Sequence, residues 1–189
     1  MHINRKHIFL SSKYQNATRY CFTPRLLTKL HSDIFENIDM VPTDFQALVH
    51  RFYAVQAERV EAYRLFDEGH EAYLRTGPHY DFDHYRQLVH EITQAFCGLS
   101  KEVLEIKERL HQDFDRPDLS EHIDKLQKKE KQKLELTAKL QLAKQKAQDH
   151  PEDEGCQEKI QEVKQDIIKN KEALSDILQD FKYDSEESV

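Results

Sequence analysis

The sequence has few of the residues that interrupt helices: four Gly, five Pro and no Trp among 189 residues. Apolar residues make up 38% of the chain, below the roughly 45–50% (glycine included) of an average globular domain. Charged residues make up 33%, above the usual figure of about 25%. A thick hydrophobic core is therefore not expected, and the abundance of Lys, Glu, Leu and Gln favours long helices joined along thin apolar seams.

Cysteine is also scarce, and the three thiols, Cys21, Cys97 and Cys156, lie far apart. They form no C-x-x-C pair, so neither a zinc-binding motif nor a disulfide framework is indicated, and reduced thiols are expected. The chain lacks any apolar run of the roughly 20 residues that a membrane span requires. We therefore expect no membrane association.

Catalytic signatures are missing as well. His70-Glu71 and His90-Glu91 begin like a metalloprotease helix, but each lacks the second His one turn later. The sequence contains no Walker A loop, no G-x-G-x-x-G and no G-x-S-x-G. These features predict a protein that is not an enzyme and has no cofactor or metal.

Charge is distributed unevenly along the chain. Residues 1–32 carry six Lys or Arg and no Asp or Glu, so the remaining residues carry a net charge of −13 against −7 for the whole chain. Residues 1–40 are predicted to be a basic, disordered tail, with a mitochondrial transit peptide as the alternative. Because phosphate neutralisation dominates nucleic-acid affinity, an acidic body favours protein partners over nucleic acid.

Two helices are predicted in the first half of the chain, over about 43–75 and 82–112. The first has Thr43 as its N-cap and an apolar seam interrupted by Arg59 and Gly69. The second follows an N-cap at Asp81, and its nine seam positions are all apolar: Phe82, Tyr85, Val89, Ile92, Phe96, Leu99, Val103, Ile106 and Leu110. With only a short connection around Gly77-Pro78, the fold class is all-α, built on a long antiparallel helical hairpin or coiled coil.

Two further helices are predicted, over about 118–148 and 155–183, followed by an acidic tail at 185–189 that begins to lose order from Asp184. The third helix is rich in Lys, and its later apolar residues, Leu142 among them, do not continue a clean seam. A solvated face explains this pattern better than nucleic-acid binding, since no Arg or aromatic residue is interleaved. Asn170 falls on the seam of the fourth helix, where it either fixes the register or the oligomeric state, or marks fraying of the seam.

The connection between the first two helices is dense in His, Tyr and Arg, the residue types that dominate binding hot spots. We predict a partner-binding surface there, and expect Tyr73, Phe82 and Tyr85 to hold the turn. The alternative is a packed turn without binding function, and a metal set of His79, Asp81, Asp83 and His84 is a weaker one. The predicted partner-binding residues are His70, His79, Tyr80, Asp83, His84 and Arg86.

Arg59 requires a separate prediction, because a charge on an apolar seam is costly without a partner or access to solvent. In the antiparallel pairing of the first two helices, Glu102 is the nearest acid. An Arg59–Glu102 ion pair is therefore expected.

These motifs also carry a family resemblance. Gln56-Ala57-Glu58-Arg59, Gly69-His70, Gly77-Pro78-His79-Tyr80-Asp81-Phe82 and Ile177-Leu178-Gln179-Asp180-Phe181 resemble the required for excision 1-B domain family of DNA repair proteins. The resemblance covers roughly residues 43–184. It implies a part in the excision repair of damaged DNA and a nuclear location, and it supplies no catalytic residues.

Together, the residues and the resemblance predict a non-enzymatic accessory or adaptor protein of nucleotide excision repair that binds a repair complex. The alternative is a structural coiled-coil component of a cytoskeletal or organellar complex. Direct binding to damaged DNA is disfavoured by the acidic body. The expected location is the nucleus, with the cytoplasm or mitochondria as alternatives.

Overall fold

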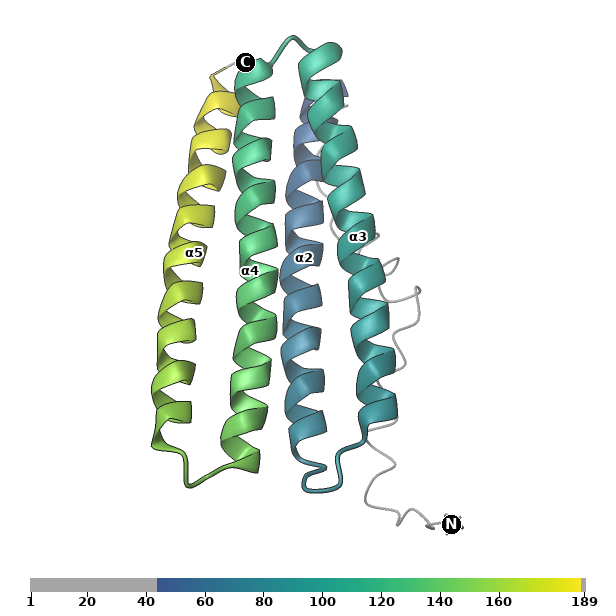
Figure 1. Ribbon diagram of the computed structural model, residues 1–189. Coiled ribbons are helices and arrows are strands. Elements are labelled where there is room, and N and C mark those ends of the chain that lie inside the picture. Colours follow the sequence, from purple (N-terminus) through teal and green to yellow (C-terminus); the bar gives the residue numbers. More distant parts are fainter. Residues whose placement is uncertain (1–43, 188–189) are drawn as a thin grey trace. The chain divides into compact units, whose positions relative to one another are not determined.

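The computed structural model describes residues 44–187, which form four long helices: α2 (Asp44–Leu74), α3 (Phe82–Gln112), α4 (Pro117–Asp149) and α5 (Glu154–Glu186) (Figure 1). The predicted all-α class is confirmed, since these residues contain helices and short connections. None of the four helices is both long and apolar enough to cross a membrane. The predicted tail at 1–40, the N-cap Thr43 and Cys21 lie outside the described residues.

The helices run alternately up and down, and all belong to one unit, Ile38–Val189. α2 packs on α3 and α4 packs on α5, while α4 also packs on α3 and α2. The α2–α3 and α4–α5 connections therefore lie at one end of the helices, and the α3–α4 connection lies at the other (Figure 1). This arrangement places two connections, distant in sequence, beside each other.

Local chemistry explains where the helices begin. The Asp81 carboxylate accepts a hydrogen bond from the backbone N–H of His84, so Asp81 is the N-cap of α3, as predicted. Pro117 stands in the first turn of α4, where a missing N–H costs nothing. Asp153 caps α5 by accepting from the N–H of Gly155.

The apolar stripe of α3 is only partly covered. From Ile92 to Leu110 its seam residues are buried. Toward the start of the helix, Tyr85 and Val89 are half-buried, and Phe82 is 60% exposed. The expectation that Phe82 holds the turn is therefore wrong, and this end of the stripe faces solvent.

The prediction of an Arg59–Glu102 ion pair is wrong. Glu102 is bound instead by Arg51, which lies about two helical turns before Arg59 and also pairs with Glu58. Arg59 is 2% exposed and donates to the side-chain oxygen of Gln127 on α4, at 2.5 Å. Arg59 also donates to the Ser100 hydroxyl of α3 at 3.3 Å, but the pairing of α2 with α3 alone could not reveal the closest acceptor, which comes from a third helix.

Gly69, the second interruption of the α2 seam, marks a close approach between α2 and α3. A Cβ atom at this position would lie 2.0 Å from Cδ2 of Leu88. The glycine therefore leaves the space that the Leu88 side chain fills.

The end of α5 is ordered by contacts with the other helices. The ring of Phe181 packs on Phe52 of α2, with centroids 4.3 Å apart. Asp184 accepts from the ring of His122 at 2.6 Å, and its carbonyl accepts from Arg116 at 2.6 Å. The expectation of disorder from Asp184 is therefore wrong for the helical residues up to Glu186.

Asn170 does not mark fraying of the fourth helix. Its side chain is 3% exposed, and its amide nitrogen donates to the carbonyl of Lys129 and to the side chain of Gln132 on α4, both at 3.2 Å. The polar seam position thus fixes α5 against α4.

Candidate partner-binding site at the hairpin tip

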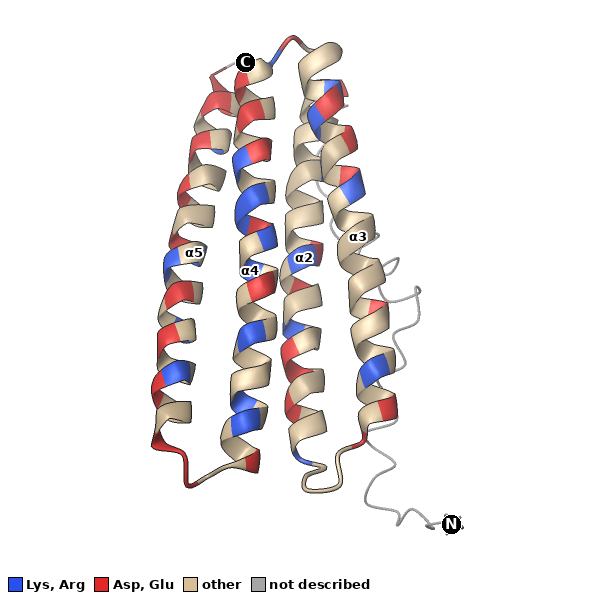
Figure 2. Ribbon diagram, in the orientation of Figure 1, with Lys and Arg blue, Asp and Glu red and all other residues tan. Residues whose placement is uncertain are grey.

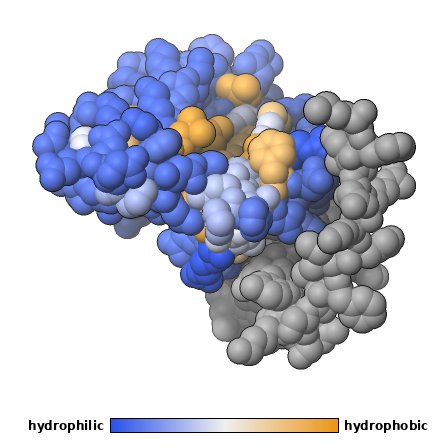
Figure 3. Space-filling model, turned by 60° about the horizontal axis from the view of Figure 1, so that its bottom comes forward, coloured by the Kyte–Doolittle hydropathy of each residue, from blue (hydrophilic) through white to orange (hydrophobic). Residues whose placement is uncertain are grey.

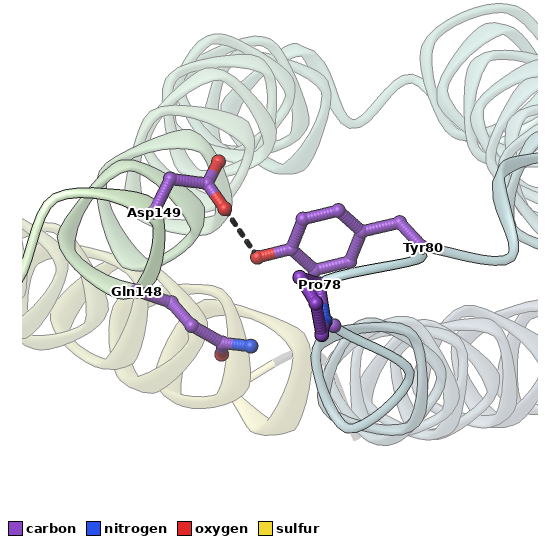
Figure 4. A pocket seen from close by; sticks show the side chains of 5 residues that line it. Pro78, Tyr80, Gln148 and Asp149 are labelled. Atoms are coloured by element: carbon purple, nitrogen blue, oxygen red, sulfur yellow. Dashed lines mark hydrogen bonds between the residues drawn. The ribbon is translucent and has the colours of Figure 1, made fainter.

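The hairpin tip, which we define as residues 75–81 between α2 and α3, is fastened to the end of α4 (Figure 4). The Tyr80 hydroxyl donates a hydrogen bond to Asp149 Oδ1 at 2.5 Å. The Gln148 amide donates to the Leu74 carbonyl at 2.7 Å. Gly77 lies beside both, and a Cβ atom there would come within 2.6 Å of Gln148 Nε2.

Three tyrosine rings stack next to this contact, and the ring of His70 meets the last of them at an angle. Tyr80 stacks on Tyr73 with centroids 5.0 Å apart, Tyr73 stacks on Tyr85 at 4.4 Å, and Tyr85 contacts His70 at 5.6 Å. The Tyr85 hydroxyl then donates to Gln141 on α4 at 2.7 Å. Tyr73 and Tyr85 therefore pack at the turn, and Tyr80 joins them.

The other predicted partner-binding residues lie on the outside of the tip and of the first turn of α3. His79, Asp83, His84 and Arg86 are all exposed. Asp83 lies 3.7 Å from Arg86, in an ion pair between two well-solvated side chains. These four remain accessible to a partner.

The candidate metal set does not come together. His84 Nδ1 lies 2.6 Å from Asp81, but this contact belongs to the N-cap of α3. Among residues 44–187, no group of three or more His, Cys, Asp or Glu side chains could hold a metal ion.

His70 is buried rather than exposed. Its side chain is 2% exposed, and its Nδ1 atom has no hydrogen-bond partner among the described residues. Burial, together with the nearby charge of Lys144, lowers the pKa of His70 to about 4. The imidazole is therefore neutral at physiological pH, with one polar atom unsatisfied.

An apolar groove opens next to this ring, between α3 and α4. Phe66 and His70 of α2 are buried and form its floor, whereas Phe82 and Leu142 at its rim are 60% and 68% exposed. Figure 3 shows apolar surface at this end of the helices, set among hydrophilic residues. The groove has a volume of about 330 Å³, and we call it the tip groove; its lining is Phe66, His70, Phe82, Tyr85, Arg86, Val89, Ala138, Gln141, Leu142 and Gln145.

The α4 side of the tip groove is basic. Around the lining residues Ala138 and Leu142, α4 exposes Lys131, Lys139 and Lys146, and Figure 2 shows basic residues spread along this helix. Glu135 is the acidic residue of α4 between Lys131 and Lys146. The groove therefore combines apolar walls with exposed cations on its α4 side, of which Lys146 pairs with Asp153 at 3.1 Å.

A second polar cluster lies inside the helices, away from the tip. The Tyr63 hydroxyl lies 3.2 Å from a carboxylate oxygen of Glu130, and the Lys133 ammonium lies 3.8 Å from the centre of the Tyr63 ring. Burial lowers the pKa of Lys133 and raises that of Tyr63. Because these groups partner one another and are largely enclosed, the cluster joins α2 to α4 and offers no open reaction site.

Sequence reasoning missed the α4 half of the site. Gln141, Leu142 and Asp149 were not predicted to be near the tip. The one available signal was Leu142, an apolar residue off the seam of a lysine-rich helix, where exposure is the simplest explanation.

Comparisons with known proteins identify relatives of this chain. A family model described as DNA repair REX1-B matches residues 47–144. The chain is similar to the required for excision 1-B domain-containing protein of Bos taurus, with 41% identity over 74% of this chain and 76% of that protein. It is also similar to the Mus musculus protein of that name, with 37% identity over 74% of this chain and 80% of that protein. No solved structure matches significantly.

Proposed function

This chain belongs to the DNA repair REX1-B family, and from that premise we propose that it is a non-enzymatic accessory protein of nucleotide excision repair. It works by binding proteins of a repair complex in the nucleus. The family supports the repair context, and the tip groove supports the binding mode.

The exposed apolar rim of the tip groove is the observation that carries the proposal. Phe82 and Leu142 lie on opposite helices and face one opening, with most of each side chain in water. Folding gains nothing from leaving such side chains uncovered, and paired apolar residues around a concave surface are typical of protein-binding sites.

Protein binding agrees better than catalysis with the chemistry of the tip. Asp81 and His84 are engaged in the helix cap, and Tyr80 is engaged with Asp149. The groove that remains is lined mostly by carbon, with a single histidine at its floor. Such a surface suits side-chain capture rather than proton transfer.

Loss of the protein tests the repair role directly. Removal of ultraviolet photoproducts from genomic DNA is measured in cells without the protein and in the same cells after re-expression. The proposal expects slow removal that re-expression restores. Normal removal, combined with disturbed filaments or organelles, would instead support a structural coiled-coil component.

A further inference from the structure

The tip groove lies at the start of α3, where the apolar stripe of this helix continues but is no longer covered by the other described helices. The stripe is unbroken from Leu110 to Phe82, yet the exposed fraction rises from 0% at Leu110 to 60% at Phe82. Val89 and Tyr85 lie between, half-covered, in the groove wall. The surface therefore has the apolar composition of a helix–helix contact, but none of the other described helices covers it. A docking surface without its bound partner has this character.

The charged side chains at the border of the groove indicate which charge a partner should carry. Lys139 follows the lining residue Ala138 directly, and Lys146, which pairs with Asp153 at 3.1 Å, lies one turn beyond Leu142 on the same exposed face. Arg86 contributes a third cation from α3, with a side chain that is 72% exposed and lies 3.7 Å from Asp83. An acidic side chain next to an apolar anchor would meet Lys139 directly and would compete with Asp153 and Asp83 for the other two cations, and complementary charge also speeds encounter.

His70, at the floor of the groove, favours a ligand that carries a polar group. His70 Nδ1 is buried and has no partner among the described residues, and a buried polar atom left unpaired is unfavourable. An aliphatic anchor would leave that atom unpaired. An aromatic side chain with a polar end, Tyr or Trp, can fill the apolar walls and bring a hydrogen-bonding group to the imidazole edge.

We propose that the tip groove binds an acidic peptide segment of a partner protein, which inserts one Tyr or Trp side chain between Phe82 and Leu142 toward His70. This inference rests on the proposed function, since it names the kind of partner that the same surface takes. Residues 1–32 of the chain itself are basic, with six Lys or Arg and no acid, so their charge repels rather than matches the border. A second copy would oppose one basic border with another.

A displayed library of random peptides, selected on the full-length protein, tests the proposal although the partner is unidentified. Enriched peptides are sequenced, and their affinities are measured by fluorescence anisotropy. The variant is Leu142→Glu, which places an acid on the rim. The matched control is Val60→Glu, because Val60 is also apolar, 65% exposed and helical but lies outside the groove. Circular dichroism checks that both variants fold.

The expected peptides carry a Tyr or Trp flanked by Asp or Glu. Leu142→Glu should weaken them at least about tenfold, as loss of a hot spot does, whereas Val60→Glu should bind as wild type. Changing the anchor of the peptide from Tyr to Phe should weaken binding several-fold. The inference is overturned if no peptide is enriched, if the enriched peptides are basic or lack an aromatic residue, or if they bind a folded Leu142→Glu protein normally.

These outcomes are separable from the repair role. Peptide capture with normal photoproduct removal in cells lacking the protein would leave the groove assignment intact and refute the proposed function. Impaired removal without peptide capture would do the reverse.

Discussion

The hydroxyl of Tyr80 donates a hydrogen bond to Asp149, a residue 69 positions later in the chain. The bond joins the loop after α2 to the last residue of α4, and it raises the pKa of Tyr80 to about 12 because the phenolate would face a carboxylate. Since Tyr80 also stacks on Tyr73, the tip is held in place against the end of α4. The groove next to the tip can therefore stay open.

Two substitutions separate the bond from the stack. Tyr80→Phe removes the hydroxyl and should lower the free energy of unfolding slightly, because the hydrogen bond that it loses is exposed to solvent. Tyr80→Ala also removes the stacking on Tyr73 and should lower the free energy of unfolding further. Urea denaturation measures both, with Tyr183→Phe as control because Tyr183 is 59% exposed. Equal stability of all four proteins would show that the tip contact does not stabilise the fold.

A second prediction concerns Arg59 and Gln127. Gln127→Leu leaves the buried guanidinium without its closest acceptor and should cost about 1.5–3 kcal/mol, as for a hydrogen bond to a charged group. Adding Arg59→Met removes the charge that needed the acceptor, and the double variant should recover a large part of the loss. A double-mutant cycle of unfolding free energies measures this coupling. Strict additivity of the two single changes would contradict the pairing.

A third prediction follows from the pKa of His70, which lies at about 4 in the native protein against an ordinary value of 6.5. Below pH 6.5 the imidazole of His70 is protonated in the unfolded chain, whereas in the native protein it becomes protonated only near pH 4. The contribution of neutral His70 to the free energy of unfolding is therefore fully present above pH 6.5. This contribution decreases as the pH is lowered toward 4, and roughly 2 kcal/mol of it is lost at pH 5.

The measurement is the free energy of unfolding of wild type and His70→Phe between pH 7 and 4. The difference between the two proteins isolates His70 from the other titrating groups, and it should shift in favour of His70→Phe as the pH falls. A constant difference between wild type and His70→Phe would mean that burial does not hold the imidazole neutral.

The helices themselves could be predicted because their signals are local. The unbroken stripe of α3 and the carboxylate of Asp81 specify a helix within a few residues, whatever lies around it. Which part of the stripe is buried could not be predicted. Whether Phe82 is buried depends on the path of α4, and this path is set by packing between residues far apart in the sequence.

The candidate site shows the same limit. Composition indicated that the tip was unusual, but it could not tell a Tyr that binds a partner from one that binds its own chain. Tyr80 proved to meet Asp149, and His70 proved to be buried. Conversely, Leu142 reached the site from a helix whose pattern predicted only a solvated surface.

The most direct test of the account combines the groove with the repair role. Leu142→Glu and Val60→Glu are expressed at equal levels in cells that lack the protein, and removal of ultraviolet photoproducts is followed with time. Both positions are similarly exposed, so each change should alter stability by no more than about 0.5 kcal/mol.

We expect Val60→Glu to restore the removal rate of wild type and Leu142→Glu, folded and equally abundant, not to restore it. Equal restoration by the two variants would contradict the claim that this protein acts in repair through the tip groove.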